Sequence, residues 1–177
     1  MKYLQIKGKQ AIIRRATKSD AKALVDYLNI IGAESDFLTF GKEGLGIAVE
    51  AEEDFIESNM SKKNTLFLVA EIEGKIIGNL NFSGGIRPRT RHTGEFGVSV
   101  LKEYWGHGLG GELITYLLDW AKSTQIITKI NLQVRTDHYK AIRLYKKLGF
   151  TEEGLKRREI YIDDQYYDML LLGLFIN

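Results

Sequence analysis

Apolar positions along the chain follow two spacings, one typical of strands and one of helices. Short apolar or alternating runs bounded by turn residues predict strands over residues 11–15, 66–72, 75–82, 93–101, 129–135, 159–161 and 167–174. Recurrence at three and four residues predicts helices over 21–31, 50–60, 109–120 and 141–148. This order predicts an antiparallel meander, one βαβ crossover and a closing hairpin. We therefore expect one α+β domain over residues 1–177, with a mixed, mostly antiparallel twisted sheet flanked by helices.

Local signals place the ends of several of these elements. Glu73-Gly74 is a tight hairpin signal, and Thr17-x-x-Asp20 resembles a capping box that begins the first helix. Gly149 is expected to end the last helix as its C′ residue. Residues 32–48 contain four glycines and are expected to form a loop or a broken helix, followed by a helix with Phe55 and Ile56 inward.

A glycine-rich turn, Tyr-Trp-Gly-His-Gly-Leu-Gly-Gly over residues 104–111, lies between a predicted strand and a predicted helix. Such a turn lets the main chain approach a ligand closely, and the following helix N-terminus offers free N–H groups, an arrangement suited to phosphate. Gly106, Gly108 and Gly111 also fit the dinucleotide fingerprint G-x-G-x-x-G. Too few strands follow for that fold, and there is no Gly-Lys-Ser/Thr sequence of a P-loop.

A second motif favours a different ligand. Residues 138–150, His-Tyr-Lys-Ala-Ile-Arg-Leu-Tyr-Lys-Lys-Leu-Gly-Phe, resemble the second signature of the GNAT superfamily of N-acetyltransferases, Asn-x-x-Ala-x-x-Leu-Tyr-x-x-x-Gly-Phe. The glycine turn then resembles the pyrophosphate loop of that family, Gln/Arg-x-x-Gly-x-Gly/Ala. Trp105 stands where Gln or Arg is usual, and His138 where Asn is usual. The resemblance covers roughly residues 11–172 and implies the GNAT fold, with a splayed central strand pair.

The resemblance implies acetyl-CoA as co-substrate. The main-chain groups of Val98 and Val100 are expected to pair with the pantetheine arm, where an N–H can also polarise the acetyl carbonyl. The expected cofactor contacts are Val98, Ser99, Val100, Trp105, Gly106, His107, Gly108, Leu109, Gly110, Gly111, His138, Lys140 and Tyr145. For Trp105 a packing role is the alternative, and His107 is expected to offer only its backbone N–H.

The resemblance also suggests catalytic roles. Tyr145 matches the family tyrosine that protonates the departing thiolate, although a core tyrosine on the same helix face is the alternative. Relatives that acetylate ribosomal protein N-termini have a glutamate base where this chain has Gln133. Glu95 is our candidate base, with an exposed strand-end carboxylate as the alternative and His92 as the next candidate. There is no cysteine, so we expect direct attack of an amine on the thioester without a covalent enzyme intermediate.

Composition narrows the remaining classes. A net charge of +2 favours neither nucleic acid nor a membrane surface, and the three histidines lack metal-binding spacing, so no metal is expected. No signal peptide or long apolar run is apparent, which favours a cytoplasmic protein. The basic clusters at 62–63, 87–91 and 156–158 are expected to be solvated faces, one of which could meet the 3′-phosphate of coenzyme A. A homodimer stays open.

The acceptor is expected to be a small primary amine or a peptide N-terminus. Residues 159–168 mix carboxylates with tyrosines, and Glu34, Asp36 and Glu43 add acidic groups from the 28–48 region. Carboxylates and aromatic faces together suit a compact cation. A non-catalytic acyl-CoA-binding or sensing domain of the same fold is the alternative function, and a dinucleotide oxidoreductase is a less favoured one.

Overall fold

The computed structural model describes residues 1–177 and contains one eight-stranded sheet. The strands run in the order β1-β2-β3-β4-β5-β6-β8-β7, and only the β5–β6 pair is parallel. The strands are β1 (Lys2–Ile6), β2 (Lys9–Arg15), β3 (Thr65–Ile72), β4 (Lys75–Gly84), β5 (Thr93–Val100), β6 (Lys129–Arg135), β7 (Thr151–Ile162) and β8 (Gln165–Phe175). The helices are α1 (Ala21–Glu34), α2 (Val49–Ser61), α3 (Leu109–Thr124) and α4 (Tyr139–Lys147), with short 3₁₀ turns at Lys18–Asp20 and Lys102–Tyr104. The predicted meander, crossover and closing hairpin are all present.

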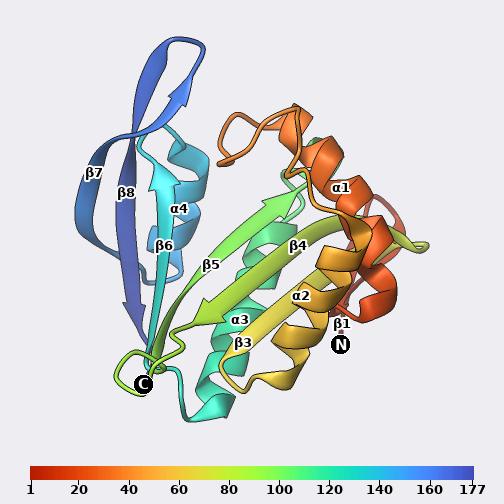
Figure 1. The fold of residues 1–177 in the computed structure, drawn as a ribbon, viewed down its shortest axis with the longest axis horizontal. Helices are drawn as coiled ribbons and strands as arrows, with labels where there is room; N and C mark the ends of the chain where they lie inside the picture. Colours follow the sequence, from red (N-terminus) through yellow and green to blue (C-terminus); the bar gives the residue numbers. More distant parts are fainter.

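The helices cover the two faces of the sheet in pairs. Figure 1 shows α1 and α2 in front of the strands and α3 and α4 behind them. The Tyr27 hydroxyl of α1 bonds to Ser99 of β5, whereas Trp120 of α3 contacts Phe82 from the opposite face. Because side chains alternate along a strand, Phe96, Val98 and Val100 face α3 and α4, while neighbouring odd-numbered residues face α1 and α2. No helix is both long and apolar enough to span a membrane.

Strands β5 and β6 separate soon after they meet. Their pairing extends only from Thr93 opposite Lys129 to Glu95 opposite Asn131. Beyond Glu95 the two strands diverge, and Figure 1 shows the widening gap between them. One half of the sheet contains β1 to β5, and the other contains β6, β8 and β7. The expected splayed strand pair is therefore present, and it leaves one edge of β5 unpaired.

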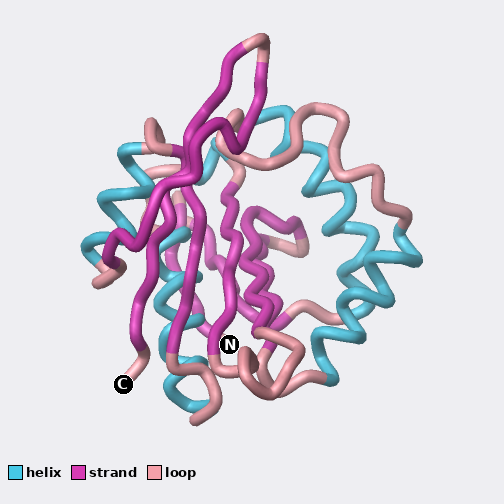
Figure 2. The backbone as a smooth tube through the Cα atoms, turned by 60° about the vertical axis from the view of Figure 1, so that its left-hand side comes forward, coloured by secondary structure: helices cyan, strands magenta, loops and turns pink.

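The two ends of the chain differ from the sequence-based expectation. Lys2–Ile6 forms an additional strand that pairs with β2 through a turn at Lys7-Gly8, where both residues have positive φ. The last hairpin is longer than predicted, because β7 begins at Thr151 rather than at Glu159. Its tip, at Asp163-Asp164, projects beyond the rest of the sheet (Figure 2). Strand β8 pairs with β6 and separates it from β7.

The segment between α1 and α2 is a loop over residues 35–48, and α1 continues through Gly32 to Glu34. A Cβ at Gly32 would lie 2.2 Å from the Gly41 carbonyl oxygen, so glycine permits the loop to fold back on the helix. In α2, Ile56 is fully buried as expected, but Phe55 is 40% exposed. The expectation that Phe55 points inward was wrong, because its ring makes only an edge-on contact with the Phe67 ring and stays partly exposed.

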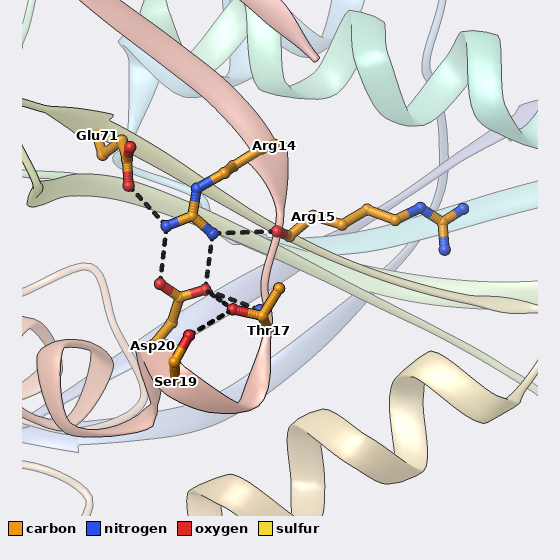
Figure 3. Close-up of polar contacts among 6 residues, drawn as sticks. All are labelled: Arg14, Arg15, Thr17, Ser19, Asp20 and Glu71. Carbon is orange, nitrogen blue, oxygen red and sulfur yellow. Dashed lines mark hydrogen bonds and ion pairs between the residues drawn. The ribbon is translucent and has the colours of Figure 1, made fainter.

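A salt-bridge cluster fixes the start of α1 to the sheet. Arg14 of β2 donates to both oxygens of Asp20, at 2.7 and 2.8 Å, and to Glu71 of β3 at 2.6 Å (Figure 3). The Thr17 N–H and hydroxyl both donate to Asp20 Oδ2, which confirms the predicted capping box. Burial raises the pKa of Asp20, but the hydrogen bonds from Arg14 and Thr17 outweigh burial, so this pKa lies below its ordinary value.

Candidate active site

The unpaired edge of β5 offers main-chain groups to a ligand. Leu101 donates its N–H to Ile77 of β4, and the Thr93 carbonyl accepts from Gly85 on the same side. Because these directions alternate along a strand, the N–H and C=O groups of Val98 and Val100 face the gap toward β6. The Val100 carbonyl accepts a hydrogen bond from the Trp105 indole at 2.6 Å. The Val98 groups and the Val100 N–H therefore face the gap without a strand partner.

Ser99 is placed differently from its two neighbours. Its main-chain groups face β4, and its hydroxyl donates to Asn79 Oδ1 at 2.7 Å while accepting from Tyr27 at 2.9 Å. Burial raises the pKa of Tyr27, so this phenol stays protonated and remains a donor. Any contact of Ser99 with a cofactor stays a prediction, and the geometry shows Ser99 as part of the floor on the α1 face.

The glycine turn leads directly into α3. Gly106 and Gly108 both have positive φ, +80° and +81°, a conformation that side chains rarely adopt. Gly108 is the N-cap, so Leu109, Gly110 and Gly111 are the first residues of the helix and their N–H groups point out of its end. A Cβ at Gly106, Gly108 or Gly110 would meet nothing within 4 Å. The turn thus combines open space, free N–H groups and the positive end of a helix dipole, which together suit a pyrophosphate.

Tyr145 lies on the α4 side of the gap. Its ring packs edge-on against Phe96 of β5 and against Phe150. The side chain is buried, and burial raises the pKa of Tyr145 to about 12. No side chain or backbone group accepts a hydrogen bond from its hydroxyl, although the hydroxyl is not fully enclosed. The phenol therefore presents an unused proton donor beside the open edge of β5.

Glu95 lies on the opposite face of the same strand. Both of its carboxylate oxygens accept from the Gln133 amide of β6, each at 3.1 Å. This bond crosses the gap at the place where β5 and β6 part. Consecutive strand residues point to opposite faces, so Glu95 and Phe96 lie on different faces of β5. Tyr145 contacts the Phe96 ring, and Glu95 and Tyr145 therefore flank the gap from its two faces. His92, the other candidate base, lies at the closed end, where its carbonyl accepts from Thr128 at 2.8 Å.

The face toward α1 and α2 contains polar groups in and around an open space. A Cβ at Gly97, between Glu95 and Ser99 on this face, would meet nothing within 4 Å. The cross-strand partner of Gly97 is Asn81, whose Oδ1 is buried and accepts no hydrogen bond. An unpaired buried acceptor beside open space suits a ligand that carries N–H donors. Asn81 and Tyr27 were not predicted from the sequence, because nothing local distinguishes them from other strand and helix residues.

Arg135 at the end of β6 holds the 35–48 loop over this face. Its guanidinium donates twice to Asp137, at 3.0 and 2.6 Å, and to the Asp36 carbonyl at 2.6 Å. Its guanidinium carbon lies 3.7 Å from the centre of the Tyr167 ring and 4.8 Å from that of Phe37. The sequence analysis missed this residue, because its partners come from three separate segments. An arginine in a half-buried strand pattern is the only local signal that could have indicated it.

The other predicted cofactor contacts occupy varied positions. His138 is the N-cap of α4, and its ring stacks on Phe37 with centroids 3.8 Å apart. Burial lowers the pKa of His138, which favours the neutral ring. Trp105 and His107 extend from the glycine turn. Trp105 donates its indole N–H to the Val100 carbonyl, but its side chain is 42% exposed, so it is not a buried packing anchor. Lys140 is exposed at the start of α4.

Most of the acidic residues expected near the acceptor have partners within the protein. Glu34 accepts from the Lys102 N–H at 2.8 Å, and Glu43 accepts from the Gly41 N–H at 2.8 Å. Asp168 accepts from the Arg158 N–H at 2.8 Å. The Asp36 carboxylate has no such bond, and it belongs to the loop that Arg135 holds. No group of three His, Cys, Asp or Glu side chains could hold a metal ion.

Comparison with known proteins identifies the family to which this arrangement belongs. Residues 35–150 match the Acetyltransferase (GNAT) family. The L-amino acid N-acetyltransferase AaaT of Escherichia coli is 31% identical over 101 residues, which cover 57% of this chain and 62% of AaaT. The spermidine N(1)-acetyltransferase of Vibrio cholerae is 30% identical over 119 residues, covering 67% of this chain and 61% of that enzyme. The chain thus matches less than two thirds of the length of either relative.

Solved structures share the whole fold. An acetyltransferase of the GNAT family from Streptococcus pneumoniae superposes with a TM-score of 0.91 and 35% identity, covering 94% of this chain and 99% of that one. A phosphinothricin acetyltransferase from Sinorhizobium meliloti, solved in complex with acetyl-CoA, has a TM-score of 0.81 and 18% identity, with 94% of this chain and 89% of that one covered. The second likeness concerns the fold alone.

Proposed function

Because the chain belongs to the GNAT family of acetyltransferases, we propose that it transfers the acetyl group of acetyl-CoA to a primary amine, either on a small molecule or at a peptide N-terminus. Acetyl-CoA is the co-substrate of the family, and the amine acceptor is what we propose for this chain. The observation that carries the proposal is the gap between β5 and β6, with a free proton donor on one face and a carboxylate on the other.

The cofactor would follow the path that the free main-chain groups mark. The glycine turn and the N-terminus of α3 would hold the pyrophosphate, and the open edge of β5 at Val98 and Val100 would pair with the pantetheine arm. This path ends near Glu95, where β6 again pairs with β5 and closes the gap. The acetyl thioester would then lie between Tyr145 and Glu95.

Direct transfer needs two proton movements. The amine nitrogen attacks the acetyl carbon and forms the C–N bond, and the C–S bond breaks with its electron pair on sulphur. Glu95 accepts the proton lost from the amine, directly or through water, and Tyr145 donates to the departing thiolate. With a pKa of about 12, Tyr145 is protonated throughout the neutral range and is always available as a donor. A Val98 or Val100 N–H would stabilise the oxyanion.

The acceptor would enter from the α1 and α2 face. The open space over Gly97 lies beside the Glu95 carboxylate, the unpaired Asn81 Oδ1 and the Ser99 hydroxyl, which are groups able to accept hydrogen bonds from a ligand. An amine carries donors that match these acceptors, whereas an alcohol offers a single O–H. The Asp36 carboxylate, in the loop that Arg135 holds, would favour a cationic acceptor through its charge.

A panel of amines with acetyl-CoA would test the proposal, with the release of free thiol as readout. The panel would include amino acids, polyamines, aminoglycosides and short peptides, and alcohols would serve as controls. At least one amine should release thiol faster than water does. Release with alcohols only would overturn the amine assignment. Tight acetyl-CoA binding with no amine-dependent release would instead support a non-catalytic acyl-CoA-binding domain.

A further inference from the structure

Apart from the gap between β5 and β6, the protein has a hollow at the end of α3 that is remote from the glycine turn. It has a volume of about 340 Å³ and is lined by Arg15, Lys62, Lys63, Thr65, Trp120, Thr124 and Ile126. These residues come from the end of β2, the connection between α2 and β3, the start of β3, and the C-terminal part of α3 with the residues that follow it. The sixteen residues of α3 place this hollow about 24 Å from the N-terminus of the helix, at 1.5 Å per residue. It is therefore distinct from the proposed cofactor and acceptor sites.

The side chains around this hollow offer donors and almost no acceptors. Three of the seven lining residues are cations, and none is a carboxylate. The Arg15 guanidinium, the Lys63 ammonium and the Trp120 indole N–H have no hydrogen-bond partner, and Lys62 has one, the Ser58 hydroxyl at 2.8 Å. The Thr65 and Thr124 hydroxyls are already bonded to the main chain. A hollow with unpaired donors of like charge suits an anion.

Arg14, the neighbour of Arg15, shows that not every cation on β2 lacks an acidic partner. Arg14 and Arg15 are consecutive and point in opposite directions, as Figure 3 shows. Arg14 meets two carboxylates, with contacts of 2.6 to 2.8 Å, whereas Arg15 meets none within 4 Å. The same strand thus contains one arginine that is neutralised within the fold and one that is not.

More positive charge is held beside the hollow by Asn64. Its side-chain amide donates to the Gly85 carbonyl at 3.0 Å, and its main-chain carbonyl accepts from the Gly84 N–H at 2.9 Å. These bonds fix the β4–β5 loop next to Lys62 and Lys63. The loop contains Arg87, Arg89 and Arg91, and none of the three forms a salt bridge. Six cations without a salt bridge therefore belong to the hollow and to the loop beside it, in a molecule whose net charge is only +2.

We propose that this hollow binds a small anion with two or more phosphate groups, at a site separate from that of acetyl-CoA. Arg15 offers a planar set of donors that matches a phosphate, and Lys62 and Lys63 add two mobile point charges. The hollow is within the size range of small-ligand sites but too confined for a folded partner. The C-terminal end of the α3 dipole accounts for one or two nearby cations but not for six.

Calorimetric titration of the protein saturated with coenzyme A would test the site, because the glycine turn is then occupied. The probes are inorganic pyrophosphate, ATP and a short single-stranded oligonucleotide. Pyrophosphate or ATP should bind, and the affinity should fall as salt is added. Equal affinities indicate that phosphate alone is recognised, whereas tighter binding of ATP indicates that the nucleoside also contacts the protein.

Matched variants locate the binding. Arg15→Gln and the double variant Lys62→Gln/Lys63→Gln should each weaken pyrophosphate binding by about tenfold or more, since each removes charge-assisted hydrogen bonds. Lys75→Gln removes an unpaired charge at the start of β4, opposite the far end of β3, and should change nothing. All variants should keep the melting temperature and the acetyl-CoA affinity of the wild type. Absence of binding by either small phosphate, equal affinity in all variants, or binding of the oligonucleotide alone would overturn the proposal.

Discussion

At the scale of single residues, the two faces of β5 separate the roles in the proposed reaction. Phe96 directs Tyr145 to one side of the gap, and Glu95 projects from the other side, toward Gln133. The free Tyr145 hydroxyl contributes nothing visible to the fold, because no group accepts its hydrogen bond. Its removal therefore tests catalysis with little effect on stability.

Tyr145→Phe is expected to lower kcat by about 100-fold, as the loss of a general acid does, and to leave acetyl-CoA affinity within a few-fold. The melting temperature should stay the same, because the ring contacts with Phe96 and Phe150 are retained. Steady-state kinetics and thermal melts measure both quantities. An unchanged kcat would show that Tyr145 is only a core residue.

Glu95→Gln is expected to lower kcat/KM and to remove the rise of activity with pH that ionisation of a catalytic carboxylate produces. Gln133→Ala is the matched control, since it removes the amide bonded to Glu95 but keeps the carboxylate. This control should keep most of the activity, because the carboxylate is retained. If Glu95→Gln lowers the rate equally at every pH, the base is His92 or a chain of water molecules.

Gly97→Val is expected to raise the KM of the amine without changing acetyl-CoA affinity. A Cβ at this position would meet no protein atom within 4 Å, so the valine side chain would begin in open space on the acceptor face. Valine also suits a strand, so the fold should tolerate the change. Kinetics with each substrate varied in turn would separate the two effects. A weaker acetyl-CoA affinity would place the cofactor, not the acceptor, over Gly97.

At the scale of elements, the turn before α3 combines glycines with different requirements. Gly108 has a positive φ, so any side chain there strains the backbone, whereas Gly110 lies within α3 and its φ is not positive. Both positions have open space around a Cβ. Loss of binding after a change at Gly108 is therefore ambiguous, and Gly110 provides the cleaner test.

Gly110→Ala is expected to weaken acetyl-CoA binding by about tenfold or more, because the added methyl group would occupy the space proposed for the pyrophosphate. The same change should raise the melting temperature slightly, since alanine in a helix is about 0.5–1 kcal/mol more favourable than glycine. Calorimetry and thermal melts give the two values. Unchanged affinity would mean that the turn does not hold the pyrophosphate.

The contact between α1 and the sheet should make stability depend on pH in the acid range. The pKa of Asp20 is lower in the folded protein than its ordinary value of 3.8. A carboxyl with a depressed folded pKa stabilises the fold above its unfolded pKa, and this contribution is lost as the pH falls through the folded pKa. Denaturant unfolding of Asp20→Asn should thus lack part of the stability loss that the wild type shows below about pH 4. The same pH dependence in both proteins would contradict the assignment.

At the scale of the whole molecule, the two halves of the sheet are joined by only three paired residues on each of β5 and β6, before these strands separate. Acetyl-CoA in the gap would contact α3 and β5 in one half and α4 in the other. At about 100 times its Kd it should stabilise the native state by about 2.7 kcal/mol, a rise of several degrees in melting temperature for a chain of this length. NAD should produce no shift. A shift with NAD but not with acetyl-CoA would contradict the cofactor assignment.

Much of this fold could be predicted because its signals are local. Hydrophobic spacing located four helices and most strands, and Glu73-Gly74, Gly149 and the Thr17–Asp20 capping box all function as expected. The first strand was missed because Lys2–Ile6 is short and partly polar, and a hairpin partner is what makes it a strand. Strand β7 was predicted too short because its residues are largely exposed, so their hydrophobic pattern is weak.

The sequence by itself determined the family, the co-substrate and the glycine turn, because each depends on residue types at fixed spacing along a continuous segment. Only the tertiary structure decided which groups face one another across the sheet. The Glu95–Gln133 bond, the Arg135 contacts with the 35–48 loop and the cationic hollow at the end of α3 each join segments that are distant in sequence. Such contacts depend on strand order and on where β5 and β6 separate, and neither property is encoded in a local pattern.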